Sequence, residues 1–220
     1  YMLMLQQGDK DFLAYLEERY TFAQTYQHSA EFAAALQQRC GVSRGDRVAI
    51  LSRNNPQWMM AFIGATTIGA VAVPMNAWWT TEELDYGFED SGAKVVVADR
   101  SRIERLAPIA QKHGLQIISI DDCEGLGVEH TPFAELLSVH AGAQMPQVEV
   151  GADDYATIMY TSGSTGHPKG ALSSHRGILS ALYSWMLLGL AARSVAARAE
   201  QLTETAYPPA GLLTIPLFHC

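Results

Sequence analysis

Apolar and polar positions along this chain repeat with helical spacing in some segments and form short, continuous apolar runs in others. The first clear helical pattern lies in residues 21–39, with Gly41 following as a stop signal. Apolar runs rich in valine and isoleucine, typical of buried strands, occupy residues 47–51, 71–74, 94–99 and 115–120. Helical patterns separate these runs, so strands and helices are expected to alternate.

Polar residues mark where the intervening helices begin. An asparagine followed by Pro56 predicts the first of these helix starts, because proline is well tolerated in the first turn. Thr80 and Glu83 have the spacing of a capping box, in which each satisfies a backbone N–H at the helix start. Ser101 and Glu104 repeat that spacing and predict the start of the next helix.

The alternation of short strands with helices predicts an α/β fold, built as a layered, largely parallel sheet flanked by helices. Residues 121–150 are more irregular and hold one short helical pattern, at residues 132–139. An apolar run at residues 155–161 predicts a buried strand that leads into a glycine-rich loop, with a helix from about Ser174.

The last part of the chain contains its most apolar segments. Residues 178–192 form an apolar run of fifteen residues. A membrane span needs about 20, so a buried or half-buried helix is expected and no transmembrane segment. Residues 193–210 are polar and alanine-rich, which predicts a mobile connection. The apolar run at 212–218 predicts a strand at an exposed sheet edge, and from it self-association as a homodimer.

Composition narrows the class of protein. The chain has 220 residues, 48% of them hydrophobic and 17% charged, which indicates a packed globular protein. Its net charge is −8 and no basic run stands out, so nucleic acid is not an expected partner. Cys40, Cys123 and Cys220 lack the spacing of metal ligands, so no metal site is expected. Free thiols in a reducing, cytoplasmic compartment are the simplest interpretation.

The glycine-rich loop carries the clearest chemistry. Backbone N–H groups of such a loop can converge on phosphate oxygens, while hydroxyls add donors and a lysine adds charge. The hydroxyl donors are Thr161, Ser162, Ser164 and Thr165. Gly163 and Gly166 let the backbone approach closely, and Lys169 supplies the cation. The spacing fits neither the Walker A loop nor the dinucleotide-binding fingerprint, so a phosphate loop of another kind is predicted.

The segment IMYTSGSTGHPKG, residues 158–170, resembles the signature loop of the adenylate-forming (AMP-binding) superfamily. That superfamily includes acyl-CoA synthetases, aryl-CoA ligases, luciferases and the adenylation domains of peptide synthetases. Residues 41–99 look like its N-terminal region, and the ending LLTIPLFHC looks like the start of its PLFH motif. The resemblance implies that residues 1–220 are the first part of the large N-terminal domain of an adenylate-forming enzyme.

The resemblance also implies a two-step reaction. A carboxylate attacks the α-phosphate of MgATP to give an acyl adenylate and pyrophosphate, and a thiol, commonly coenzyme A, then takes the acyl group. Thr161 to Gly166 and Lys169 match the loop that holds the β- and γ-phosphates. His219 matches the PLFH histidine, which implies a place in the lining of the acyl or adenylate site. ATP, Mg²⁺ and coenzyme A are the ligands so implied, and a fatty acid is the expected carboxylic acid.

The main catalytic residues of the superfamily have no match within the chain and are expected beyond Cys220. They include the glutamate of a YGxTE segment, the aspartate that binds ribose and the lysine of a C-terminal domain. The expectation is therefore an N-terminal fragment of an acyl-CoA synthetase that is inactive alone.

For one histidine, one arginine and the tryptophans, a structural role is at least as good an explanation as contact with a ligand. His175 and Arg176 match a common stretch of the superfamily, but capping of the following helix explains them equally well. His167 lies at a variable position of the loop and receives no role. The four tryptophans are expected in the core or in subunit contacts; they are Trp58, Trp78, Trp79 and Trp185.

Two alternatives remain open from the sequence. One is an aryl-acid or amino-acid adenylating enzyme of the same superfamily. The other is a short, non-catalytic protein that binds phosphate or acts as a scaffold. A reading frame that continues into the YGxTE segment would separate the second from an enzyme.

Overall fold

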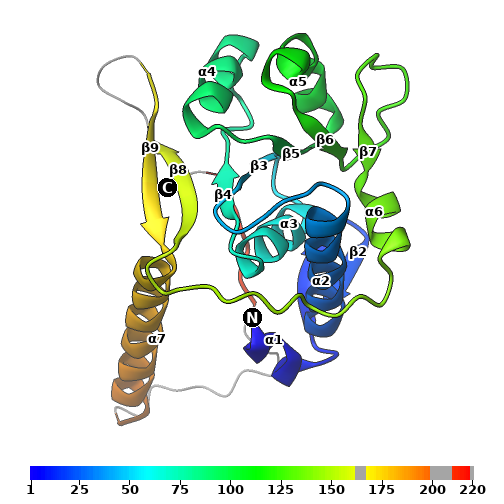
Figure 1. Cartoon of the computed structure of the whole chain (residues 1–220). Coiled ribbons are helices and arrows are strands. Elements are labelled where there is room, and N and C mark those ends of the chain that lie inside the picture. The colour runs from blue at the N-terminus through cyan, green and yellow to red at the C-terminus, as the bar shows by residue number, and fades with distance from the viewer. Residues whose placement is uncertain (162–166, 199–209, 219–220) are drawn as a thin grey trace.

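A seven-stranded sheet forms the centre of the molecule (Figure 1), as seen in the computed structural model, which describes residues 1–161, 167–198 and 210–218. Its strand order is β7-β6-β5-β3-β4-β8-β9, and every neighbouring pair is parallel except β8 with β9. The strands are β3 (Arg47–Leu51), β4 (Val71–Pro74), β5 (Val95–Ala98), β6 (Gln116–Ser119), β7 (Thr131–Pro132), β8 (Tyr155–Thr161) and β9 (Lys169–Ser174). The prediction of a largely parallel sheet flanked by helices is confirmed.

Helices cover both faces of this sheet. On one face lie α2 (Phe22–Gln38), α3 (Pro56–Thr67) and α6 (Phe133–Val139), and on the other lie α4 (Thr81–Ser91) and α5 (Arg100–His113). Alternate residues of each strand serve the two faces, since side chains point to opposite sides along a strand. In β3, for example, Val48 and Ile50 pack under α2 and α3, while Ala49 and Leu51 pack under α4 and α5. Every valine of β5 is buried, which explains its unbroken apolar run.

Most of the predicted helix starts are correct. Asn55 caps α3 by accepting a hydrogen bond from the Trp58 N–H, with Pro56 in the first turn. Thr80 and Glu83 form the predicted capping box of α4. The predicted start of α5 at Ser101 and Glu104 is wrong. Asp99 caps this helix, because it follows β5 directly and its carboxylate accepts from the Arg102 N–H.

The N-terminal residues add three elements that the apolar pattern did not predict. They are α1 (Met2–Gln7) and an antiparallel hairpin of β1 (Asp11–Tyr15) and β2 (Glu18–Thr21). The hairpin strands are mostly exposed, so no regular apolar alternation marks them. Phe12 stacks on Phe22 at a centroid distance of 4.4 Å, which holds the hairpin against the start of α2.

The glycine-rich loop leads into a strand and not directly into a helix, which corrects the predicted order of strand, loop and helix. β9 returns along β8 as its antiparallel partner and forms one edge of the sheet. Only then does α7 (His175–Arg198) begin, close to the predicted Ser174. β8 is partly buried: Ala156, Thr157 and Tyr160 are buried, Ile158 and Met159 are intermediate, and both ends of the strand are exposed.

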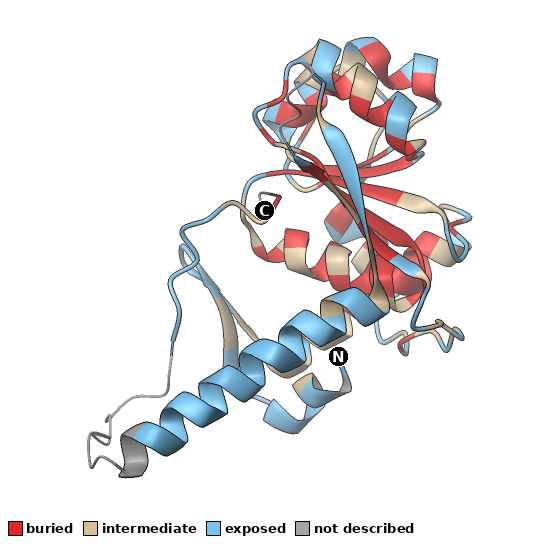
Figure 2. Cartoon of the chain, turned by 90° about the vertical axis from the view of Figure 1, so that its left-hand side faces the viewer, coloured by how far each residue is buried: buried red, intermediate tan, exposed pale blue. Residues whose placement is uncertain are grey.

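The expectation that the apolar run at 178–192 is buried is also wrong. Residues 179–192 are all exposed, only Ile178 is partly buried, and the helix projects away from the sheet (Figure 2). Large apolar side chains on it include Trp185, 70% exposed, and Leu188, 68% exposed. By length and composition alone, His175–Val195 could cross a membrane, with a mean hydropathy of 1.4. The absence of a transmembrane segment therefore stays a prediction.

The C-terminal run predicted as a strand is irregular over its described residues, 210–218. Asn54 holds it by two hydrogen bonds: its Nδ2 donates to the Ile215 carbonyl oxygen at 2.9 Å, and its Oδ1 accepts from the Leu217 N–H at 2.8 Å. Leu212 remains 90% exposed. Since this segment pairs with no described strand, the apolar sheet edge expected here does not form.

Candidate functional site

The carboxyl ends of the parallel strands meet at one edge of the sheet, which is where ligands bind in open α/β folds. β8 runs parallel to β4, so its carboxyl end lies at this same edge. Thr161 is the last residue of β8 and Lys169 the first of β9. The fold therefore places Thr161 and Lys169, the two described residues of the predicted phosphate loop, at the ligand-binding edge.

Thr161 and Lys169 are brought together by the hairpin. They are direct partners across β8 and β9, and the Thr161 hydroxyl donates to the Lys169 carbonyl oxygen at 3.5 Å. Both side chains are exposed, so the hydroxyl and the ammonium are free to meet an anion. The other predicted members lie outside the described residues: Ser162, Gly163, Ser164, Thr165, Gly166 and the acyl-site residue His219.

The residue before the loop is held by a polar and aromatic cluster. The Tyr160 hydroxyl donates to Asp90 Oδ2 at 2.6 Å, and the Tyr160 ring packs edge-on against Trp79 at a centroid distance of 5.2 Å. Burial, and after it the carboxylate of Asp90, raises the pKa of Tyr160 well above its usual value. Tyr160 therefore stays protonated at any physiological pH and acts as a fixed donor.

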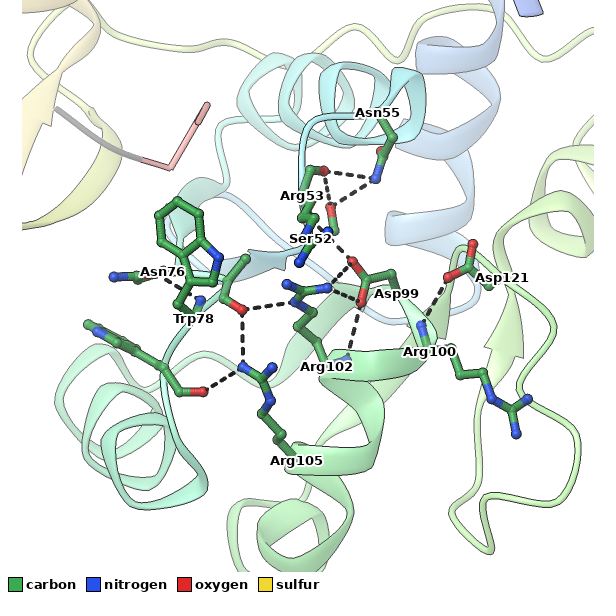
Figure 3. Close-up of polar contacts among 12 residues, drawn as sticks. Ser52, Arg53, Asn55, Asn76, Trp78, Asp99, Arg100, Arg102, Arg105 and Asp121 are labelled. Carbon is green, nitrogen blue, oxygen red and sulfur yellow. Dashed lines mark hydrogen bonds and ion pairs between the residues drawn. The ribbon is translucent and has the colours of Figure 1, made fainter. Parts of the chain in front are cut away.

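Arginines and aspartates tie together the segments that follow β3, β4 and β5 (Figure 3). Asp99 Oδ2 accepts from the Arg53 N–H at 3.3 Å and pairs with the Arg102 guanidinium at 3.2 Å. Arg102 Nε and Arg105 Nη1 both donate to the Ala77 carbonyl oxygen. Because Arg102 is only 4% exposed and fully engaged, it shapes this edge and is not available to a ligand.

A cavity of about 280 Å³ lies at this edge, beside the C-terminal segment. Its lining comprises Tyr15, Arg53, Asn54, Trp78, Thr214, Pro216 and Phe218. Trp78 is 57% exposed and meets Phe218 edge-on at a centroid distance of 5.1 Å. Aromatic walls with one arginine suit a partly apolar anion. Phe218 directly precedes His219, so the predicted acyl-site position adjoins this cavity in sequence.

The sequence did not single out this cavity. Trp58 and Trp79 lie in the core as expected, at 4% and 6% exposure. Trp78 instead lines the cavity. Its position in the sequence could have indicated this. Trp78 follows the predicted strand at 71–74 by four residues, and ligand-binding residues of parallel sheets lie just after the carboxyl ends of the strands.

His175 and Arg176 have structural roles at the start of α7. Ser174 pairs with Tyr155 at the amino end of β8, so these two residues lie at the opposite edge of the sheet from the loop. The Arg176 guanidinium pairs with Asp153 at 2.7 Å and lowers the pKa of that carboxyl group. Burial lowers the pKa of His175, whose Nε2 has no hydrogen-bond partner among the described residues. The capping contact at the start of α7 comes from Ser174, whose Oγ accepts from the Gly177 N–H at 3.2 Å, and not from the side chain of His175 or Arg176.

Metal-binding side chains do not gather in the described ranges. Across residues 1–161, 167–198 and 210–218, no group of three or more His, Cys, Asp or Glu could hold a metal ion. Cys40 and Cys123 are free thiols, and burial raises the pKa of both. Neither is activated as a nucleophile.

Sequence comparisons match the chain to one family of enzymes. A family model described as "AMP-binding enzyme" matches residues 4–220. A long-chain-fatty-acid–CoA ligase of Mycobacterium tuberculosis is 35% identical over 195 residues, covering 84% of this chain and 34% of that protein. A 4-coumarate–CoA ligase of Oryza sativa subsp. japonica is 33% identical over 165 residues, covering 75% and 29%. The chain thus spans about a third of the length of the curated relatives it matches.

Solved structures agree with the sequence comparisons. A fatty acyl CoA synthetase of Mycobacterium tuberculosis superposes with a TM-score of 0.67 at 32% identity, covering 84% of this chain and 36% of that one. An anthranilate CoA ligase in complex with anthranoyl-AMP superposes with a TM-score of 0.72. Its identity is 24%, with 77% of this chain and 32% of that chain covered, so it supports the fold alone.

Proposed function

Because the chain belongs to the AMP-binding enzyme family, we propose that it is the phosphate-binding part of an ATP-dependent acid–thiol ligase. In this reaction a substrate carboxylate oxygen bonds to the α-phosphorus of MgATP, and the bond to the departing pyrophosphate breaks. A thiol, proposed to be that of coenzyme A, then takes the acyl group and AMP leaves. The observation that carries the proposal is the pairing of Thr161 with Lys169 at the end of the β8–β9 hairpin.

The residues of this chain act on the outer phosphates of ATP in this account. Lys169 and the Thr161 hydroxyl, with the intervening residues 162–166, hold the β- and γ-phosphates. They orient the pyrophosphate group and stabilise the negative charge that it gains as it leaves, which is positioning and electrostatic catalysis. Mg²⁺ enters as part of the MgATP substrate. His219, which follows the cavity residue Phe218 in sequence, is proposed to line the acyl or adenylate site.

A fatty acid is the proposed substrate, with an aryl acid as the second candidate. The fatty-acid assignment draws on the 35% identical long-chain-fatty-acid–CoA ligase. The aryl candidate draws on the 4-coumarate–CoA ligase relatives and on the aromatic lining of the cavity by Tyr15, Trp78 and Phe218. We further propose a cytoplasmic location, which is consistent with the free thiols of Cys40 and Cys123.

The 220 residues alone are proposed not to turn over. The support is length: the chain corresponds to about a third of its curated relatives, and its described residues contain no carboxylate cluster for Mg²⁺. Adenylation would then require residues beyond those of this chain.

The test is ATP–pyrophosphate exchange with a panel of short to long fatty acids and several aryl acids. It should be run on the 220-residue chain and on the complete gene product. The proposal expects exchange by the complete product, strongest with fatty acids, and none by the 220-residue chain. Exchange by the short chain would overturn the proposed inactivity. The absence of exchange with every acid in the complete product would overturn the proposed reaction.

A further inference from the structure

Helix α4 contacts the polypeptide on both sides of residues 162–166. The contacts come from Tyr86 and Asp90, which are four residues apart and therefore neighbours on one helix face. Asp90 reaches Tyr160, the residue before Thr161, and Tyr86 reaches His167 and the carbonyl group of Pro168. One helix face thus touches both ends of the predicted phosphate loop.

The contact on the entry side is closely packed. Besides donating to Asp90, the Tyr160 hydroxyl lies 3.4 Å from the Gly87 carbonyl oxygen. The Tyr160 ring is 9% exposed and packs against Trp79, which itself lies against Gly87. A Cβ atom on residue 87 would lie 2.7 Å from the Trp79 ring, so only glycine allows this approach. Because Gly87 has no side chain, α4 can pack closely against Trp79, which in turn packs against Tyr160 at the end of β8.

The contact on the exit side joins a ring stack to a hydrogen bond. The rings of Tyr86 and His167 stack at a centroid distance of 4.9 Å and an interplanar angle of 27°. The Tyr86 hydroxyl donates to the Pro168 carbonyl oxygen at 3.2 Å. Pro168 immediately precedes Lys169, so this contact fixes the backbone from which the predicted phosphate-binding cation projects.

The helix is itself anchored on its other side. Asp85 pairs with Lys112 Nζ and His113 Nε2 of α5, each at 2.6 Å, and the Thr81 hydroxyl donates to the Arg105 carbonyl oxygen at 3.0 Å. α4 is therefore fixed to α5 and to the sheet, and can serve as a rigid support for the hairpin.

We propose that Tyr86 and Asp90 are positioning residues, which hold Thr161 and Lys169 in the arrangement that binds the outer phosphates of ATP. This inference rests on the proposed function of the loop and names the part of the fold that supports it. Phosphate binding depends on donors being held in place before the anion arrives, and residues that lock those donors contribute without touching the ligand.

The first arm of the test measures anchoring without any ligand, by residue-resolved amide hydrogen exchange in the 220-residue chain. Tyr86→Leu and Asp90→Ala should each speed exchange at the hairpin-end residues 159–161 and 169–172 by about fivefold, the effect of losing one hydrogen bond. Amides of α2 and α3 should be unaffected. Unchanged exchange at the hairpin end in both variants would overturn the inference.

Conservative variants separate the contacts from general effects of substitution. Asp90→Asn keeps an acceptor for the Tyr160 hydroxyl, so it should restore most of the protection. Tyr86→Phe keeps the stack on His167 but loses the hydrogen bond to the Pro168 carbonyl oxygen, so it should restore only part of it. Leu136→Ala removes a buried side chain of α6 on the opposite face of the sheet and lowers stability without touching α4. Leu136→Ala speeds exchange through global unfolding at all amides. After that contribution is subtracted, the exchange rates at residues 159–161 and 169–172 should equal those of the unaltered chain.

The second arm measures the dissociation constant for magnesium pyrophosphate by calorimetry, with the same variants. Tyr86→Leu and Asp90→Ala should each raise it by about fivefold, while Leu136→Ala and Asp90→Asn change it less than about twofold. Tyr86→Phe should have an intermediate effect, because it loses the hydrogen bond to Pro168 and keeps the ring stack. Faster hairpin exchange with an unchanged dissociation constant would overturn the positioning role alone. No pyrophosphate binding by the unaltered chain would contradict the phosphate role of the loop, and with it the positioning that depends on that role.

Discussion

Asp99 shows how much of this fold can depend on one side chain. It follows β5 directly, caps α5, accepts a hydrogen bond from the Arg53 N–H and balances the charge of buried Arg102. These contacts link the segments after β3 and β5 to the start of α5, at the edge of the sheet that carries the cavity and the loop. A carboxylate with several partners at a strand end is thus a structural residue here, although its position is typical of a functional one.

Replacing Asp99 with alanine should be strongly destabilising. The change removes a helix cap and leaves the Arg102 guanidinium buried without its ion-pair partner, so we expect a loss of about 3 kcal/mol in the free energy of unfolding. Urea denaturation followed by circular dichroism measures it. Glu104→Ala, which removes an exposed carboxylate of the same helix, is the control and should cost less than about 0.5 kcal/mol. Equal losses in the two variants would refute the role given to Asp99.

At the scale of elements, one carboxylate of α4 makes two charged contacts with α5. Asp85 Oδ1 lies 2.6 Å from His113 Nε2, and both carboxylate oxygens accept from Lys112 Nζ. The hydrogen bond from Lys112, and after it that from His113, lowers the pKa of Asp85 in the folded state. The unfolded chain therefore binds a proton at this carboxylate at higher pH than the folded chain does.

This difference predicts how stability depends on pH. The contribution of Asp85 is fully present above its unfolded pKa of about 4, and is lost as pH falls through the lower folded value. In Asp85→Asn the free energy of unfolding should fall less steeply below about pH 4. Chemical denaturation between pH 2 and pH 7, run beside Glu82→Gln as an exposed control on the same helix, measures the slopes. Identical slopes for the unaltered chain and Asp85→Asn would contradict this assignment.

Sequence pattern predicted those elements whose identity is set by local signals. β3, β4, β5 and β6 are buried and rich in valine and isoleucine, and the caps of α3 and α4 are formed by neighbouring residues. β9 was missed because its sequence, KGALSS, has weak strand propensity and is set by pairing with β8 across the loop. The strand predicted at 212–218 does not form. Its sequence is apolar enough for a strand, but its backbone hydrogen-bonds to the side chain of Asn54 and not to another strand.

In the candidate site, too, some residues could be predicted from local sequence and others could not. Thr161 and Lys169 could be predicted because a dense glycine and hydroxyl pattern surrounds them. The support given by Tyr86 and Asp90 could not, since those side chains lie about 70 to 80 residues away in sequence and meet the loop only in the fold. The cavity at Trp78 likewise combines residues from four separate parts of the chain.

At the scale of the whole molecule, the uncovered apolar surface lies on α7. Along this helix Trp185, Leu187 and Leu188 are each at least 65% exposed. Exposed apolar surface of this extent marks an interaction site in a soluble protein. The self-association predicted from the sequence stays a prediction, and we propose α7 as its surface in place of an edge strand at 212–218.

The 220-residue chain should associate in a concentration-dependent manner, as measured by size-exclusion chromatography with light scattering. Trp185→Glu combined with Leu188→Glu places two charges on α7 and should shift the population toward the monomer. Leu213→Glu, in the exposed C-terminal segment, is the matched control and should have little effect. A monomer at high concentration, or an effect of the control as large as that of the α7 variant, would be inconsistent with α7 as the association surface.

The most direct test of the central claim is the affinity of this chain for MgATP, measured by calorimetry on the unaltered protein, Lys169→Ala and Lys10→Ala. Lys10 is an exposed lysine of the N-terminal segment whose ammonium group donates a hydrogen bond to Gln7, so it controls for the loss of a surface charge. A lysine that contacts phosphate contributes a charge-assisted hydrogen bond, so Lys169→Ala should weaken binding by about tenfold or more. Lys10→Ala should bind like the unaltered chain. Equal affinity in all three proteins would contradict the claim that the β8–β9 loop binds the phosphates of ATP.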